Sequence, residues 1–447
     1  MSVTRLLERI AESQTVARTG RVTRILPTYI EADGPAVARG AICAIETRVG
    51  ARRDEVLAQV VGVNADSVIL APFETAAATF PGAVVTARPH ADLAPVGDAF
   101  QGRVVDAFGR PLDGGAAIRA QAFAPLGGEP GAALERTASH EPMETGVRAI
   151  DSLLTLAQGQ RVGVFAAAGV GKTSLMNQLA RQVKADRCVI CLVGERGREV
   201  EALWGRGLSS QAKARTVLVA ATSDQAAAMR VRAADYAMAL ADHWRRQGHH
   251  VLFLLDSATR LAMALRETGL AAGEPPTVRA YTPGVFAAMP RLVEGCGALA
   301  SGGAISAVMT VLSEGDEIDD PISEMMKSLL DGHILLSRKL AEQGHFPAID
   351  IPRSISRLSG GLTPKAHADD VARALTLLSV YEHSRTLIET GVYVGGANPQ
   401  IDAAIAARPG LTTFLRQRSD EHAVPAEAFK ALAKILASAP LREHADG

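Results

Sequence analysis

The sequence predicts an α/β protein of three parts: a small N-terminal β-barrel, a central domain built on a mostly parallel sheet, and a helical C-terminal domain. Short β-rich runs broken by turn residues fill the first 90 residues. An apolar run at 162–166 stops at a glycine-rich turn and continues as a helical pattern, and helical periodicity alone follows residue 360. A chain of 447 residues suits about three domains of ~150 residues each. We place a helix at 1–19, the barrel at 20–90, the central domain at 91–360 (with a connector at 91–145) and the helical domain at 361–447.

The chain begins with a short amphipathic pattern over residues 3–13. Leu6, Leu7 and Ile10 fall on one side of the expected helix, and Arg and Glu residues fall on the other. Such a helix either packs on its own domain or docks on a partner or a membrane surface. The pattern leaves both possibilities open.

Between Gly20 and about Arg88, the β-rich runs alternate with turns. They lie at 21–26, 41–47, 55–63, 67–71 and 83–86. Several short strands at this spacing are typical of a small barrel. No charged or aromatic cluster marks this segment as an oligonucleotide-binding surface. We therefore expect the barrel to serve as an assembly collar.

The loop after the run at 162–166 has the spacing of a phosphate-binding P-loop. In such a loop backbone N–H groups surround phosphates, the lysine reaches the terminal phosphates, and the Ser or Thr hydroxyl binds Mg²⁺. A helical pattern follows, as a true P-loop requires. Ala166 stands where the strict motif has glycine, but alanine is nearly as small. We expect the nucleotide-binding residues to be Ala166, Ala167, Ala168, Gly169, Val170, Gly171, Lys172, Thr173 and Ser174.

Strands and helices alternate after the P-loop. We expect strands at 188–193, 216–220, 251–255 and 304–312, and helices at 224–246, 258–267 and 321–342. This alternation predicts a mostly parallel sheet covered by helices on both faces. The C-terminal helices are expected at 371–387, 399–407 and 425–436.

Acidic residues follow two of the apolar strands. Asp256 ends the run at 251–255, an arrangement in which a buried strand holds a carboxylate for Mg²⁺ beside a P-loop. The same side chain could instead cap the next helix. Glu195 and Arg196 follow the strand at 188–193, at the sheet edge where α/β proteins bind ligands. Glu195 either activates water there or belongs to a solvated charged loop, and its position alone does not decide.

The composition excludes several classes of protein. A formal net charge of −1 gives no overall attraction for nucleic acid or anionic lipid. Four scattered cysteines do not form a disulfide framework. Cys188 and Cys191 lie three residues apart in one strand, so we expect core thiols on opposite faces. The N-terminus has no leader-peptide pattern, and there is no uncharged run of about 18 apolar residues. We expect a soluble, cytoplasmic protein.

Several motifs, in order along the chain, together resemble the family of flagellar and type III secretion export ATPases. These ATPases are relatives of rotary ATP synthase subunits. The motifs are the P-loop, GERGREV at 194–200, LDSATRL at 255–261, GEPPT at 273–277 and LDGHILLSR at 330–338. The resemblance runs from about Gly20 to Gln417. It implies a RecA-like P-loop NTPase core between the barrel and the helical domain, assembled as a homohexameric ring.

The resemblance also assigns roles to single residues. It implies that Lys172 contacts the β- and γ-phosphates of ATP, and that Thr173 and Asp256 hold Mg²⁺. Glu195 matches the glutamate that activates water, with Arg196 beside it.

Three further segments gain a role from the same resemblance. Arg357 matches the arginine finger that reaches a neighbouring subunit's nucleotide. Phe346 matches an aromatic residue that stacks on adenine, although a buried core phenylalanine is the alternative. The acidic loop at 314–321, a solvated turn on charge alone, would face the ring axis and touch a central stalk.

The family implies ATP hydrolysis that energises type III protein export, and we prefer the flagellar to the injectisome system. The implied partners are other copies of the chain in a homohexamer, an export regulator on the N-terminal helix, a central stalk protein, export substrates with their chaperones, and the membrane export gate. The protein would be cytoplasmic and peripheral to the inner-membrane export apparatus. No nucleic acid partner is expected. Because Glu195 and Arg357 lie on one chain, a ring of identical subunits has every interface complete.

Three other functions share parts of this pattern. A subunit of a rotary ATP synthase would work beside a second, differently equipped subunit. A hexameric nucleic-acid translocase should carry a basic or aromatic surface in its barrel. A regulatory subunit that binds ATP without turnover is disfavoured by the intact Glu195.

Some positions depart from the family pattern without removing a catalytic group. Gly295 and Lys327 both stand where arginine is usual, and Ala280 and Gly284 replace small or polar residues around Tyr281. With Ala166, these departures leave the turnover rate and the interface strength open.

Overall fold

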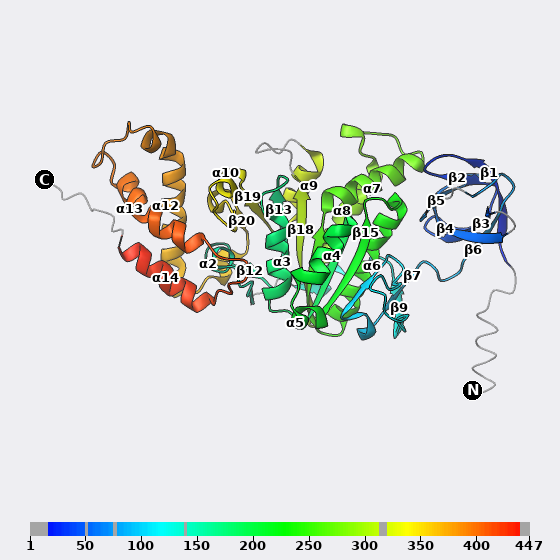
Figure 1. The fold of residues 1–447 in the computed structure, drawn as a ribbon, viewed down its shortest axis with the longest axis horizontal. Coiled ribbons are helices and arrows are strands. Elements are labelled where there is room, and N and C mark those ends of the chain that lie inside the picture. The colour runs from blue at the N-terminus through cyan, green and yellow to red at the C-terminus, as the bar shows by residue number, and fades with distance from the viewer. Residues whose placement is uncertain (1–16, 50–51, 75–77, 138–140, 313–319, 439–447) are drawn as a thin grey trace.

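The computed structural model describes residues 17–49, 52–74, 78–137, 141–312 and 320–438. Three parts follow one another along its long axis (Figure 1): the barrel at one end, the α/β domain in the middle and a group of helices at the other end. The expected helix at 3–13 and most of the acidic loop at 314–321 lie outside the described residues. Within the described ranges, every helix is too short or too polar to cross a membrane.

The N-terminal part is a closed antiparallel barrel, as predicted. Its strands follow the order β1-β2-β5-β4-β3-β6. Their bounds are Thr19–Ile25 (β1), Ile30–Ala32 (β2), Ile42–Val49 (β3), Arg52–Val63 (β4), Val68–Pro72 (β5) and Val84–Ala87 (β6). Alternate side chains such as Ile45, Val60 and Leu70 fill the interior. Strand β2 was not predicted, because three residues are too few to show a periodic pattern.

The central domain is built on one sheet with the order β20-β19-β13-β18-β16-β14-β15-β8. All neighbours from β19 to β8 are parallel, and β20 is antiparallel at the edge. The bounds are Arg103–Val105 (β8), Arg161–Ala166 (β13), Arg187–Glu195 (β14), Thr216–Thr222 (β15), His250–Asp256 (β16), Ala304–Leu312 (β18), Gly332–Leu336 (β19) and Ile355–Ser356 (β20).

Helices cover both faces of this sheet, as the alternating pattern predicted. Along β14, Val189, Cys191 and Val193 belong to the core that contains α6 (Ala227–Arg246), α7 (Ala258–Ala271) and α8 (Pro283–Gly295). Cys188, Ile190 and Leu192 belong to the other core, with α3 (Lys172–Gln182). Cys188 and Cys191 are therefore buried on opposite faces. Burial raises the pKa of the Cys188 thiol to about 11, as expected of an inert core cysteine.

The predicted single helix at 321–342 is wrong. The segment forms α9 (Pro321–Leu329), then strand β19, then α10 (Arg338–Glu342). Gly332 lies against strand β20, where an added Cβ would be 2.4 Å from the carbonyl oxygen of Ile355. After half-buried His333, the residues Ile334, Leu335 and Leu336 are buried beside β13. An apolar run that suits a helix by its spacing is thus used as a strand buried on both faces.

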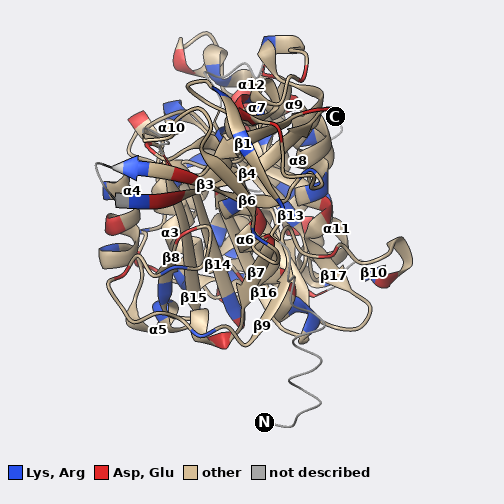
Figure 2. Cartoon of the chain, turned by 90° about the vertical axis from the view of Figure 1, so that its right-hand side faces the viewer, with Lys and Arg blue, Asp and Glu red and all other residues tan. Residues whose placement is uncertain are grey.

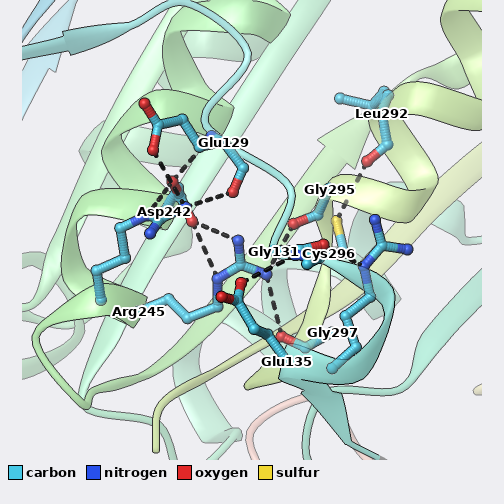
Figure 3. A network of polar contacts seen from close by, with 12 residues as sticks. Glu129, Gly131, Glu135, Asp242, Arg245, Leu292, Gly295, Cys296 and Gly297 are labelled. Atoms are coloured by element: carbon cyan, nitrogen blue, oxygen red, sulfur yellow. Dashed lines mark hydrogen bonds and ion pairs between the residues drawn. The ribbon is translucent and has the colours of Figure 1, made fainter. Parts of the chain in front are cut away.

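Buried Arg245 connects α6 to the end of α8 (Figure 3). Its Nε lies 3.1 Å from Asp242 Oδ1, and its Nη1 donates to the carbonyl oxygen of Gly295 at 2.9 Å. Asp242 also accepts the backbone N–H of Glu129 at 3.0 Å, so both charges are hydrogen-bonded. A Cβ on Gly295 would meet Met238 at an ordinary 3.5 Å, so packing does not require glycine at this departure from the family pattern.

The C-terminal part consists of helices, as predicted. They are α12 (Lys365–Glu389), α13 (Pro399–Leu415) and α14 (Pro425–Ala437). They pack against one another and on α2 (Arg148–Leu153) of the central domain. Gln417, after α13, donates its Nε2 to Gly146 and accepts the N–H of Arg148, both at 2.7 Å. This buried amide joins the helices to the segment that enters the central domain.

Candidate functional site

The predicted P-loop and acidic residues meet at one edge of the central sheet. The P-loop follows β13, Glu195 ends β14 and Asp256 ends β16. Since these strands are parallel, their carboxyl ends lie at the same edge, where open α/β sheets bind ligands. Lys172 Nζ lies 2.5 Å from Asp256 Oδ1 and 3.6 Å from Glu195 Oε1.

The loop itself has the backbone of a phosphate cradle. Gly169 and Gly171 adopt φ values of 81° and 96°, in the left-handed region that glycine enters without strain. No atom lies within 4 Å of the position that a Cβ on Gly169 would take, so the loop faces open space there. Ala166 ends β13 with an extended backbone, and its alanine side chain therefore causes no strain. The loop leads into the N-terminus of α3, which favours anions.

Asp256 is a buried acid with two polar partners. Thr310 of β18 donates its hydroxyl to Asp256 Oδ1 at 2.7 Å, and Lys172 approaches the same oxygen. Thr173, Glu195 and Asp256 line one pocket. The Thr173 hydroxyl and the Asp256 carboxylate supply oxygen ligands of the kind that Mg²⁺ prefers. The residues present therefore fit this ion.

Glu195 is held in a buried and highly charged position. Its side chain is 4% exposed, and its Oε1 atom has no hydrogen-bond partner among the residues that the structure describes. Arg260 Nη1 lies 3.1 Å from Glu195 Oε2 and also donates to the carbonyl oxygen of Gly194. A buried carboxylate oxygen that lies 3.6 Å from Lys172 Nζ but accepts no hydrogen bond within the described structure is available to accept a proton from a bound reactant.

Burial raises the pKa of Glu195 to about 7. A hydrogen bond to Glu199 and the negative charge of Asp256 act in the same direction, whereas Lys172 and Arg260 oppose the increase. The pKa of Glu199 is lowered, mainly because it accepts that hydrogen bond. Glu195 therefore titrates near neutral pH, as a general base requires.

Arg260 and Glu199 are site residues that the sequence did not reveal. Arg260 lies in the first turns of α7, four residues after Asp256, and Glu199 lies in α4 (Gly197–Ala202) after Glu195. Both lie in motifs on which the family resemblance rests, and membership of those motifs was the one sign in the sequence that they belong to the site. Their contact with Glu195 depends on how a helix follows each strand, and spacing alone does not show it.

Phe346 lies beside the P-loop. Its ring atoms are 3.5 and 3.6 Å from the position that a Cβ on Gly171 would take. The side chain is 46% exposed, which does not suit the alternative of a core phenylalanine. The backbone N–H of Gln417 donates to the Phe346 carbonyl oxygen at 2.9 Å and ties it to the helical part. Stacking on adenine stays a prediction.

Among the described residues, neither predicted arginine forms an ion pair or a hydrogen bond with Lys172, Glu195 or Asp256. Arg196 is exposed at the start of α4. Arg357 follows β20, where Ser356 pairs with Gly332, and Gly332 in turn pairs with Val162 at the start of β13. The P-loop follows the other end of β13. With about 3.3 Å of rise per strand residue, Arg357 and its own P-loop are separated by the length of that strand.

Comparisons with known proteins agree over nearly the whole chain. Residues 146–356 match the family described as ATP synthase alpha/beta family, nucleotide-binding domain, and residues 363–434 match the T3SS EscN ATPase C-terminal domain. The "Flagellum-specific ATP synthase" of Bacillus subtilis is 43% identical, and the match covers 97% of this chain and 99% of that protein. The "SPI-2 type 3 secretion system ATPase" of Salmonella typhimurium is 42% identical, with 94% and 95% covered.

Solved structures show the same similarity. The assembled ATPase EscN of the enteropathogenic Escherichia coli type III secretion system has a TM-score of 0.88 and 37% identity, over 93% of this chain and 100% of that one. EscN in complex with its central stalk EscO has a TM-score of 0.84 and 36% identity, with the same coverage.

Proposed function

The chain belongs to the family of flagellum-specific and type III secretion ATPases, and from this premise we propose that it hydrolyses ATP in a homohexameric ring to energise protein export by a flagellar system. One observation supports the ring. Glu195 lies at the carboxyl ends of the parallel strands, and Arg357 of the same chain lies at the level of their amino ends. A site that uses both must take Arg357 from a second subunit. Identical subunits arranged head to tail supply it at every interface.

The residues at the P-loop support a direct attack of water on the γ-phosphate. Backbone N–H groups of the loop and Lys172 would hold the phosphates, and Thr173 and Asp256 would hold Mg²⁺. When bound there, Mg²⁺ would supply positive charge that offsets the negative charge of the phosphates. Glu195 orients the water and accepts its proton as the new bond to phosphorus forms and the bond to the ADP oxygen breaks. Its pKa of about 7 leaves a large share of the carboxylate ionised at neutral pH.

Arg357 supplies the remaining positive charge from the neighbouring subunit. Its side chain is exposed, as a group that reaches another chain must be. Arginine fingers in GTPases increase the rate by about 10³–10⁵ by stabilising charge on the transferred phosphoryl group. Phe346 would stack on adenine beside the P-loop, and Arg196 would lie near the catalytic glutamate.

Mixing two inactive variants tests the shared site. Glu195→Gln and Arg357→Ala should each lose at least about a hundredfold in kcat. In mixed rings, an interface formed by the intact Glu195 of one variant and the intact Arg357 of the other is complete, so mixing should restore part of the activity. If either variant stays fully active alone, or if no mixture regains activity after subunit exchange, the shared interfacial site is wrong.

The export role and its partners follow from the relatives. The EscN complex with its central stalk EscO supports a stalk partner for this chain. We also propose an export regulator that binds the N-terminal segment, export substrates with their chaperones, and peripheral contact with a membrane export gate. Purification from the native cell should recover a stalk protein and a regulator. Loss of the regulator on deletion of residues 1–16, with ATPase activity retained, would place its binding site.

A type III secretion ATPase of an injectisome is the second candidate, because such relatives match nearly as well as flagellar ones. The complex with which the chain co-purifies separates the two. Hydrolysis by the purified chain without a second kind of subunit would count against a rotary synthase subunit.

A nucleic-acid translocase finds no support in the surface charge. In the view from the barrel end, basic and acidic segments are interspersed (Figure 2). Hydrolysis that single-stranded RNA or DNA does not stimulate would exclude this function.

A further inference from the structure

Two carbonyl oxygens of one short segment hold Arg357 in place. Its backbone N–H donates to the carbonyl oxygen of Asp331 at 3.0 Å, and its Nη2 donates to that of Lys327 at 3.2 Å. Lys327 lies in the last turn of α9 and Asp331 precedes β19. The position of the exposed guanidinium therefore follows the position of this segment.

The segment is in turn fixed to the start of β13. Arg161 forms a bidentate pair with the Asp331 carboxylate, with Nε–Oδ2 and Nη2–Oδ1 distances of 2.9 Å. The backbone N–H of Arg161 donates to Asp331 Oδ2 at 3.0 Å as well. Gln160 donates its Nε2 to Ser356 Oγ at 3.1 Å, which ties down the residue before Arg357. Bidentate arginine–carboxylate pairs set geometry as well as energy.

We propose that Asp331, through its pair with Arg161, is a positioning residue that presents Arg357 to the active site of the neighbouring subunit. This inference rests on the proposed function of Arg357 as a group shared across the interface. The pair lies at the start of β13, whereas the P-loop follows the end of that strand. Loss of the pair should therefore impair catalysis at the neighbour's site and leave the P-loop of its own subunit intact.

The other edge of the same sheet offers a matched control. Arg103, the first residue of β8, pairs with Asp113 through Nε–Oδ2 and Nη2–Oδ1 distances of 2.7 and 2.9 Å. Asp113 Oδ2 also accepts a strand N–H, from Val104 at 3.1 Å. The exposed fractions of the side chains are similar, 21% and 15% for this pair against 21% and 25% for Arg161 and Asp331. Neither control residue contacts Arg357 in the described structure.

The kinetic test compares Asp331→Asn with Asp113→Asn in the full chain. We expect Asp331→Asn to lower kcat by roughly 10- to 100-fold with the KM for ATP nearly unchanged, since a misplacement of about 1 Å costs about that much. Asp113→Asn should keep kcat within about twofold. In an Arg357→Ala background, Asp331→Asn should have no further effect on kcat. An unchanged kcat in the single variant, or a full additional loss in the double variant, would overturn the proposal.

Mixed rings separate positioning from a general loss of structure. Asp331→Asn subunits keep Glu195, and Glu195→Gln subunits keep a well-placed Arg357, so mixing them should restore activity. No restoration would mean that Asp331 acts within its own subunit, and the proposal would fail. If Asp331→Asn does not fold, Arg161→Lys, which keeps the charge but loses the bidentate geometry, takes its place in the same mixture. The shared site itself is tested separately, by mixing Arg357→Ala with Glu195→Gln. If that mixture regains no activity, the proposed function of Arg357 fails, whatever the result for Asp331.

Discussion

At the scale of single residues, burial brings the pKa of Glu195, the proposed base, close to neutral pH. Its pKa is raised to about 7, chiefly by burial, so the carboxylate loses its charge as the pH falls through 7. We predict that kcat/KM, which reports the free enzyme, rises about tenfold from pH 6 to pH 8 and then levels off. The measurement is the pH profile of steady-state hydrolysis, with ATP binding followed over the same range to separate binding from chemistry. A midpoint below pH 5 would contradict this environment for Glu195.

Arg260 tunes the same group. Its positive charge lowers the pKa of Glu195, against the larger effect of burial. Arg260→Gln should therefore raise that pKa further and move the rising limb of the kcat/KM profile to higher pH. Arg230→Gln is the control, because Arg230 lies close to Gly194 but pairs with Glu267 at 3.0 Å. Equal displacement of the profile in both variants would refute a specific effect of Arg260.

A site residue could be predicted from the sequence where its role follows from its place next to a strand or within a motif. Lys172 was identified by the spacing of the P-loop that follows β13, and Asp256 because it ends a buried strand, at the edge where the parallel sheet brings strand ends together. Glu195 was located from its place at the end of a strand, and the family resemblance assigned it the activation of water; its burial supports that role. Thr310 was not identified, because a threonine inside a buried strand gives no sign that its hydroxyl meets Asp256.

At the scale of elements, the parallel strands could be predicted because each is buried on both faces and bounded by helical patterns. The same rule failed at 332–336, where the apolar spacing of α9 continues into β19 without an obvious break. Gly332 is the break, and its reason is a contact with β20, more than twenty residues further along the chain. Edge strands β8 and β20, of three and two residues, are likewise set by tertiary pairing and not by their own sequence.

This contact predicts that Gly332→Ala is costly. The new Cβ would lie 2.4 Å from the carbonyl oxygen of Ile355, so the strand before Arg357 must move. We expect a loss of about 2 kcal/mol or more in the free energy of unfolding, as in other overpacked sites, together with a lower kcat. Gly360→Ala is the control, since no atom lies within 4 Å of its added Cβ. The measurement is the midpoint of urea unfolding for both variants. Equal midpoints would contradict the close pairing of β19 with β20.

At the scale of the whole molecule, the three parts followed from composition and periodicity, but the proposed division of the active site between subunits did not. Nothing in the spacing of Glu195 and Arg357 along the chain shows that a strand length separates them. The register of β20 on β19 and of β19 on β13 shows it. The ring was inferred from resemblance, and the strand register supports the shared site that we propose for it.

The proposed division of the site predicts that turnover depends on assembly. A single subunit keeps Lys172, Asp256 and Glu195 but lacks the neighbour's Arg357, so it should hydrolyse ATP at least about a hundredfold more slowly than the ring. We predict that activity per subunit rises steeply with protein concentration from the nanomolar to the micromolar range, in step with the ring population measured by mass photometry. The Arg357→Ala variant should assemble over the same range without this rise, because its interfaces close without supplying the charge. Constant activity per subunit across the dissociation range would show that each chain carries a complete site.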